Sequence, residues 1–247
     1  MPKMMFSGKH FALPEFSAGP AEPPDPPFSR SVHSLSLDVA RLKRYLQRCP
    51  QGMFVTAHAG FHPALSDLVE ELGFKHILLL RDPRDIVVSH AFYVMQDTLH
   101  QHHKYYSETL VSDDKRLMAS IRGFEEDAGD RKVLPSIRES FGAYLPWIKD
   151  RSTLVVHFED IIGPLGGGDT EKQLGEIERI GDFLERPINR EKAQRIAQKM
   201  YGKEGLTFRK GHAGDWRNHF TEAHKRAFKE VAGDLLIWLG YEEDAGW

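Results

Sequence analysis

The stretch 76–90 constrains the fold of this chain more than any other part of its sequence. Residues 77–80, Ile-Leu-Leu-Leu, form an unbroken apolar run, which is typical of a strand buried on both faces of a parallel sheet. Polar residues begin at Arg81, where that strand should end. Asp82 suits the N-cap of a helix and Pro83 its first turn, where a missing N–H needs no partner. The stretch therefore predicts a strand, a tight turn and a helix.

Two side chains of this stretch indicate an anion-binding site. Arg81 emerges at the carboxyl end of the strand, which is where open α/β sheets bind ligands. Ser89 lies about two turns into the helix, on the face that can look back toward that edge. A guanidinium and a hydroxyl beside a helix N-terminus favour a phosphate ligand. The alternative is a polar connection in which the charges of residues 81–85 pair with one another.

Strands and helices alternate along the rest of the chain, which indicates the α/β class with a parallel-sheet, three-layer α/β/α sandwich. Apolar runs predict further strands, and amphipathic periodicity predicts helices. The strands are expected at 53–56 and 153–158, and the helices at 63–72, 171–184, 190–200 and 221–239. Residues 1–33 are rich in proline and lack periodicity, so we expect a poorly ordered Pro-rich arm before an α/β domain at 34–247.

Composition excludes several classes of protein. A net charge of −3 gives no reason to expect nucleic acid or an anionic membrane as a partner. The single cysteine, Cys49, excludes an internal disulfide and a cysteine-cluster metal site, which favours a cytoplasmic location. No stretch approaches the roughly 20 apolar residues of a membrane span.

The histidines of residues 100–103 could chelate a metal, but we interpret them as part of a wet, mobile segment and predict no metal. The sequence leaves open whether this chain forms a homo-oligomer.

A second charged segment lies between the last two predicted helices. Arg209 and Lys210 are followed by Gly211 and Gly214, an arrangement that brings cations and backbone N–H groups close to a phosphate. Trp216 is costly in an exposed loop, so we expect it to anchor the segment in the core. The alternative interpretation is a basic surface loop.

The two charged segments resemble the two nucleotide-binding signatures of the cytosolic-type sulfotransferases. Residues 81–89 match the first signature, and residues 209–216 match the second. Residues 55–58, Val-Thr-Ala-His, are similar to the family segment that presents a catalytic histidine. Residues 156–160 resemble the family strand that ends in Tyr-Glu-Asp, and the similarity spans about residues 52–238 in the right order. The resemblance implies the P-loop-nucleotide-kinase-like fold of these enzymes.

The resemblance also implies an activity. The family transfers the sulfuryl group of 3′-phosphoadenosine 5′-phosphosulfate (PAPS) to a hydroxyl or amine of a small-molecule acceptor, in line and without a metal. The implied ligands of the 3′-phosphate are Arg81, Ser89, Arg209, Lys210 and Gly211.

Three further residues receive roles from the resemblance. His58 is the expected general base, since a neutral imidazole can take the proton of the acceptor hydroxyl. His62, four residues further on, is a second candidate for that role. Tyr201 stands where the family often places an aromatic ring against the adenine, and a packing residue at a helix end is the alternative.

One family feature is not found in the sequence. The family opens with a strand and a loop of the type Pro-Lys-Ser-Gly-Thr-Thr-Trp, which wraps the 5′-phosphosulfate. Neither the segment at Lys3 nor the segment at Lys9 reproduces it, and Thr56 stands where the family usually has lysine. We therefore expect a missing amino-terminal strand and loop, with exposed sheet surface and self-association, unless Lys3 or Lys9 substitutes. The alternative function is a truncated or catalytically weak nucleotide-binding or scaffold protein that retains the fold.

Overall fold

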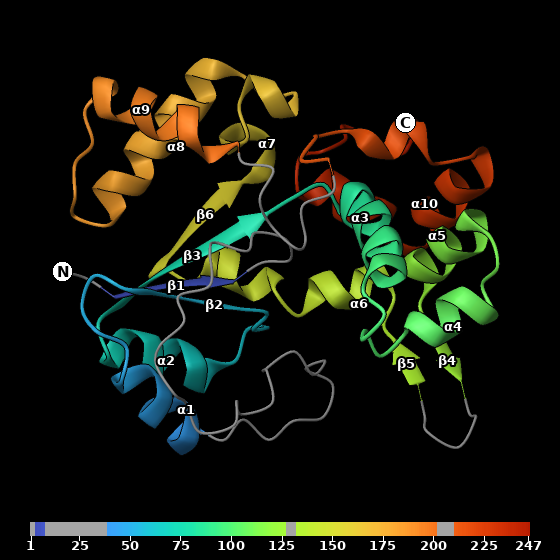
Figure 1. Ribbon diagram of the computed structural model, residues 1–247, viewed down its shortest axis with the longest axis horizontal. Coiled ribbons are helices and arrows are strands. Elements are labelled where there is room, and N and C mark those ends of the chain that lie inside the picture. Colours follow the sequence, from blue (N-terminus) through green and yellow to red (C-terminus); the bar gives the residue numbers. More distant parts are fainter. Residues whose placement is uncertain (1–2, 8–38, 127–131, 202–209) are drawn as a thin grey trace. The chain divides into compact units, whose positions relative to one another are not determined.

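The computed structural model describes residues 3–7, 39–126, 132–201 and 210–247. These residues belong to two compact units, whose elements are labelled in Figure 1. Unit 1 comprises Met1–Leu80 and Ala143–Gly211, and unit 2 comprises Arg81–Gly142 and His212–Trp247.

The sheet of unit 1 has four parallel strands in the order β2-β1-β3-β6. The strands are β1 (Lys3–Ser7), β2 (Phe54–Ala57), β3 (Phe74–Leu80) and β6 (Thr153–His157). All four run in one direction, so their carboxyl ends lie along a single edge of the sheet. The parallel sheet and its helices confirm the predicted α/β class.

Strand β1 corrects the expectation that the chain lacks its first strand. Ser7 pairs with Ala57 of β2 on one side and with Leu78 of β3 on the other, so β1 is an interior strand. The expected arm at 1–33 is therefore wrong for residues 3–7, while residues 8–33 lie outside the described part of the chain. Five residues between breakers carry too little periodicity to reveal a strand whose stability comes from two neighbours.

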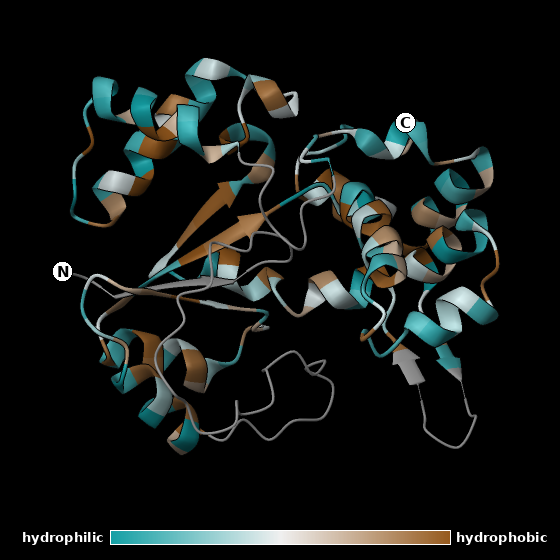
Figure 2. Ribbon diagram, in the orientation of Figure 1, coloured by the Kyte–Doolittle hydropathy of each residue, from teal (hydrophilic) through white to brown (hydrophobic). Residues whose placement is uncertain are grey.

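Helices cover this sheet on both sides. In Figure 1 the sheet lies between the pair α1–α2 and the pair α8–α9, and Figure 2 shows β3 and β6 as hydrophobic. Ile77 and Val156 form a buried cluster with Ile161, and the ends of α8 and α9 pack against it. The helical elements of unit 1 are α1 (Val39–Gln47), α2 (Pro63–Glu71), η1 (Leu145–Lys149), α7 (Phe158–Ile161), η2 (Pro164–Gly166), α8 (Thr170–Phe183) and α9 (Arg190–Met200).

The opposite face of β3 carries a buried histidine. His76 is fully buried, its ring centroid lies 4.1 Å from that of Trp147, and its Nδ1 lies 2.7 Å from the Thr153 hydroxyl oxygen. Burial lowers the pKa of His76 from 6.5 to about 4, while the nearby Asp150 carboxylate acts in the opposite direction. The imidazole is therefore neutral at physiological pH.

Unit 2 is built mainly of helices. Its longest helix, α10, buries Phe228 and Leu236 and packs against α5, which also packs against α3. The elements of unit 2 are α3 (Pro83–Gln96), α4 (His103–Glu108), α5 (Asp113–Arg122), β4 (Phe124–Glu126), β5 (Lys132–Leu134), α6 (Ile137–Gly142), η3 (Asp215–Asn218) and α10 (Glu222–Trp238). Within the described ranges of both units, every helix is too short or too polar to cross a membrane.

Candidate functional site

The turn after β3 forms as its sequence predicts. The Asp82 side chain accepts a hydrogen bond from the Arg84 backbone N–H at 2.9 Å, and Pro83 opens α3. The Arg84 guanidinium is 1% exposed, binds the Asp82 carboxylate, and lies 4.0 Å from the centroid of the Trp216 ring. Arg84 therefore stabilises unit 2, and the expectation that Trp216 anchors its segment in the core is confirmed.

Arg81 and Asp85 hold the segment that contains Trp216. The Arg81 Nη2 donates to the His212 carbonyl oxygen at 2.8 Å and lies 3.6 Å from the Asp85 carboxylate. The same carboxylate accepts hydrogen bonds from the backbone N–H groups of Gly214, at 2.7 Å, and Trp216, at 2.9 Å. The connection at the carboxyl end of β3 thus orients the part of the second charged segment that belongs to unit 2.

Asp85 is the residue that the sequence reasoning missed. Burial raises the pKa of its carboxyl, whereas the Arg81 charge and the two backbone donors act in the opposite direction. The available signal was a pair of opposite charges four residues apart, with Arg81 just before the N-cap and Asp85 in the first turn of α3. That spacing alone does not reveal the backbone partners, which lie about 130 residues away in the sequence.

Ser89 lies on α3, as predicted. Its side chain is buried, with 8% of the residue exposed. A serine hydroxyl at this position can serve a ligand oxygen as a donor.

Lys210 and Gly211, the described residues of the second charged segment that belong to unit 1, are contacted from the end of α9. Tyr201 caps the carboxyl end of that helix, and its hydroxyl donates to the Lys210 carbonyl oxygen at 2.9 Å. Gly211 has φ of 62°, a conformation that favours glycine. Arg209 lies outside the described residues.

The two candidate bases differ in their surroundings. His58 is exposed and follows Ala57, the last residue of β2, so it stands at the carboxyl edge of the sheet. His62 is the N-cap of α2, and its Nδ1 accepts from the Ala64 N–H at 3.2 Å. His62 therefore already has a structural role.

Lys3 does not stand at this edge. It is the first residue of β1 and pairs with Phe74, the first residue of β3. Ser7 ends the strand four residues later, which corresponds to about 13 Å along an extended chain. The hypothesis that Lys3 replaces the missing loop lysine is therefore wrong, and Lys9 lies outside the described residues.

A comparison of sequence families decides the identity. A sequence profile of the sulfotransferase domain matches residues 37–237, more than half of the chain. The chain belongs to the sulfotransferase family.

Two curated sulfotransferases are similar in sequence. Sulfotransferase 6B1 of Danio rerio is 25% identical over 181 residues, covering 64% of this chain and 50% of the relative. Sulfotransferase 2A6 of Mus musculus is 25% identical over 183 residues, covering 66% of this chain and 56% of the relative. The chain thus spans about half the length of these relatives.

Solved structures share the sulfotransferase fold. Mouse sulfotransferase SULT7A1 complexed with PAP matches with a TM-score of 0.56 at 20% identity, over 78% of this chain and 69% of that one. Retinol dehydratase, solved with androsterone and the inactive cofactor PAP, matches with a TM-score of 0.52 at 20% identity, over 78% and 56% of the two chains. At this identity the likeness concerns the fold.

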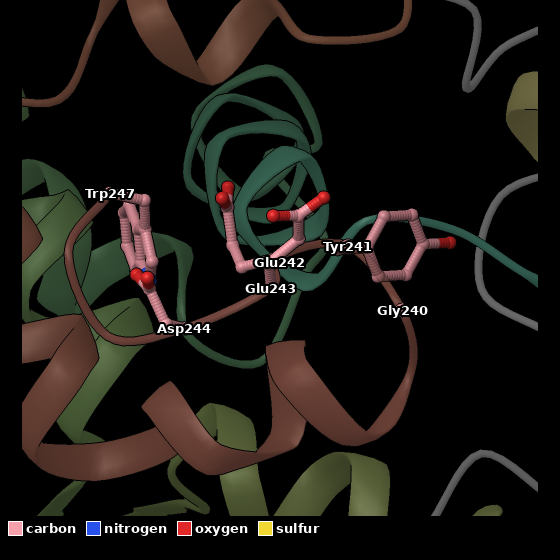
Figure 3. Close-up of a pocket in the computed structure, with 6 residues that line it drawn as sticks. All are labelled: Gly240, Tyr241, Glu242, Glu243, Asp244 and Trp247. Atoms are coloured by element: carbon pink, nitrogen blue, oxygen red, sulfur yellow. The ribbon is translucent and has the colours of Figure 1, made fainter.

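One pocket of this sulfotransferase-family chain is lined by acidic side chains, which do not suit a negatively charged nucleotide. Its lining is the carboxyl-terminal segment, and Figure 3 shows the Glu242 and Glu243 carboxylates pointing the same way, with Tyr241 pointing aside. Glu242 forms an ion pair with Arg84. An acidic lining repels phosphate, so the carboxyl edge of the sheet stays the better candidate. Among the described residues, His, Cys, Asp and Glu form no group of three or more able to hold a metal ion.

Proposed function

We propose that this chain transfers the sulfuryl group of PAPS to a hydroxyl or amine of a small-molecule acceptor. The observation that carries the proposal is the match of the sulfotransferase domain to residues 37–237. The PAP bound in solved structures of the same fold supports the choice of donor, because PAP is PAPS without its sulfuryl group.

The proposed 3′-phosphate ligands are Arg81 and Ser89, with Arg209, Lys210 and Gly211 of the second segment. The donor set suits a doubly charged phosphate, because charge-assisted hydrogen bonds from guanidinium and ammonium groups are strong. Support comes from the position of Ser89 on α3 and from the contact of Arg81 with His212, the residue that follows Gly211 in the chain.

In the proposed reaction, His58 accepts the proton of the acceptor hydroxyl as its oxygen attacks sulfur. The new O–S bond forms while the bond between sulfur and the 5′-phosphate oxygen breaks, and PAP leaves with that electron pair. A neutral imidazole suits this role near pH 7. The exposure of His58 at the end of β2 supports access by an acceptor.

The decisive experiment combines a PAP titration with a transfer assay. The protein is titrated with PAP by calorimetry and then supplied with radiolabelled PAPS and panels of phenols, aliphatic alcohols and amines. We expect saturable PAP binding and transfer to at least one panel. Failure to bind PAP would overturn the proposal.

A second candidate function is nucleotide binding without efficient transfer. The observation that favours it is the sequence that begins at the last residue of β1, Ser7-Gly8-Lys9-His10, which departs from the family loop around the 5′-phosphosulfate. PAP binding without transfer to any panel would favour this candidate.

A further inference from the structure

A glycine-rich loop, residues 163–168, connects α7 to α8 in unit 1. Its backbone closes on itself, since the N–H groups of Gly166 and Gly168 both donate to the Gly163 carbonyl oxygen, at 3.0 and 2.8 Å. Gly163 and Gly167 have φ of 72° and 84°. These bonds and turns give the loop one defined shape, although its sequence is not that of a nucleotide P-loop.

Gly166 brings this loop against the second charged segment. A Cβ atom at residue 166 would lie 2.6 Å from the Gly211 carbonyl oxygen and still closer to Cγ1 of Ile162, and both approaches are closer than such atoms make in proteins. Gly166 is buried, and it is not among the glycines with positive φ. The close approach of Gly211 and Ile162, rather than the backbone conformation, therefore requires glycine at this position.

Tyr201 fixes the preceding peptide of the same segment. Its hydroxyl binds the Lys210 carbonyl oxygen at 2.9 Å. In a trans peptide the following N–H points the opposite way, so the Gly211 N–H faces away from Tyr201. Two successive carbonyl groups are thus constrained. The Tyr201 side chain at the end of α9 binds the carbonyl of Lys210, and the backbone of Gly166 lies against the carbonyl of Gly211.

We infer that Gly166 is a positioning residue for nucleotide binding. This inference rests on the proposed function, in which Lys210 and Gly211 contribute to the 3′-phosphate site. Backbone N–H groups bind an anion well only when they are already oriented toward it. Tyr201 orients the peptide that carries the Gly211 N–H, and residue 166 limits rotation of the backbone at Gly211 by its close approach to the Gly211 carbonyl oxygen. The glycine-rich loop therefore acts on affinity for PAP and PAPS without touching the reacting atoms.

The test compares two glycine-to-alanine variants of unit 1. Gly166→Ala should raise the dissociation constant of PAP and the KM for PAPS by about tenfold or more, with kcat at saturating PAPS changed by less than about threefold. Gly175→Ala is the matched control, because a Cβ at residue 175 of α8 meets nothing within 4 Å. It should leave PAP affinity unchanged.

A second pair of variants separates the contact with Gly211 from the contact with Ile162. Ile162→Ala removes both side-chain atoms that a Cβ at residue 166 would meet. The double variant Ile162→Ala, Gly166→Ala should still bind PAP about tenfold more weakly than Ile162→Ala alone. Equal affinity of these two proteins, with both folded by circular dichroism, would overturn the inference.

The outcomes distinguish this inference from the proposed function. Wild-type protein that fails to bind PAP contradicts the proposed function. Wild-type protein that binds PAP, together with Gly166→Ala protein of the same affinity, contradicts only the positioning role. A lower melting temperature with unchanged PAP affinity would show that Gly166 serves packing alone, and it would also overturn the inference.

Discussion

The Arg81 guanidinium donates a hydrogen bond to the His212 carbonyl oxygen at 2.8 Å, across 131 residues of sequence. Both residues belong to unit 2, and Gly211, which precedes His212 in the chain, is the last residue of unit 1. A residue proposed to bind phosphate therefore also holds the polypeptide next to a second proposed ligand. Substitution of Arg81 will change both at once, so neighbouring positions give cleaner tests.

Asp85→Asn should lower the free energy of unfolding by about 1–3 kcal/mol. An asparagine keeps one acceptor oxygen, so one of the two N–H groups at Gly214 and Trp216 loses its partner, and Arg81 loses a nearby charge. Urea unfolding followed by tryptophan fluorescence measures the effect.

Asp234→Asn is the control for this prediction. Asp234 forms an ion pair with Arg138 on an exposed part of α10, and such pairs contribute less than about 1 kcal/mol. Equal losses of stability in the two variants would contradict the anchoring role of Asp85.

Tyr201→Phe should weaken PAP binding by about three- to tenfold, because it removes the hydrogen bond to Lys210 and keeps the ring. If the ring instead stacks on the adenine, Tyr201→Phe should bind PAP like the wild type, and only Tyr201→Ala should bind weakly. Calorimetric titration of both variants with PAP distinguishes the two roles.

His58→Ala should reduce sulfuryl transfer by about 10²- to 10⁴-fold and leave PAP affinity within about twofold of the wild type. His62→Ala should instead lower stability by about 0.5–2 kcal/mol, because its ring caps α2, and should retain transfer. Transfer assays with the most active acceptor, beside thermal melts, check both variants. Full activity of His58→Ala would remove this residue from the mechanism.

His76 should make unit 1 less stable in mild acid. Its folded-state pKa of about 4 lies below the ordinary value of 6.5, so the unfolded chain takes up this proton first as the pH falls. The contribution of His76 to the free energy of unfolding is fully present above pH 6.5. It falls progressively as the pH drops toward 4, by about 3 kcal/mol in total. His76→Gln should flatten the pH profile of unfolding by that amount, and an unchanged profile would contradict the assignment.

Local rules predicted much of the fold. Asp82 and Pro83 predict a helix start at this point of the sequence, and α3 begins at Pro83 in the structure. The predicted helix at 190–200 has the same bounds as α9. These elements are readable because capping groups and amphipathic periodicity act within a few residues. The candidate phosphate ligands were readable for a similar reason, since they form short charged runs.

Other features were not readable from neighbouring residues. The 3₁₀ turn at Pro164–Gly166 brings residue 166 against Gly211, and no short-range pattern encodes that approach. Likewise, the sequence left His62 as a second candidate base beside His58. The capping bond from the Ala64 N–H, which gives His62 a structural role, is seen only in the structure.

By itself, the sequence determined the strand–turn–helix at 76–90 and the two charged segments, because hydrophobic periodicity, capping and charge are local properties. Tertiary structure alone decided that Lys3–Ser7 is an interior strand, since a five-residue strand is stable only between β2 and β3. It also decided which polar atoms meet. Arg81 and Asp85 bind the backbone at residues 212–216 because buried carbonyl, amide and carboxylate groups must find partners wherever folding places them.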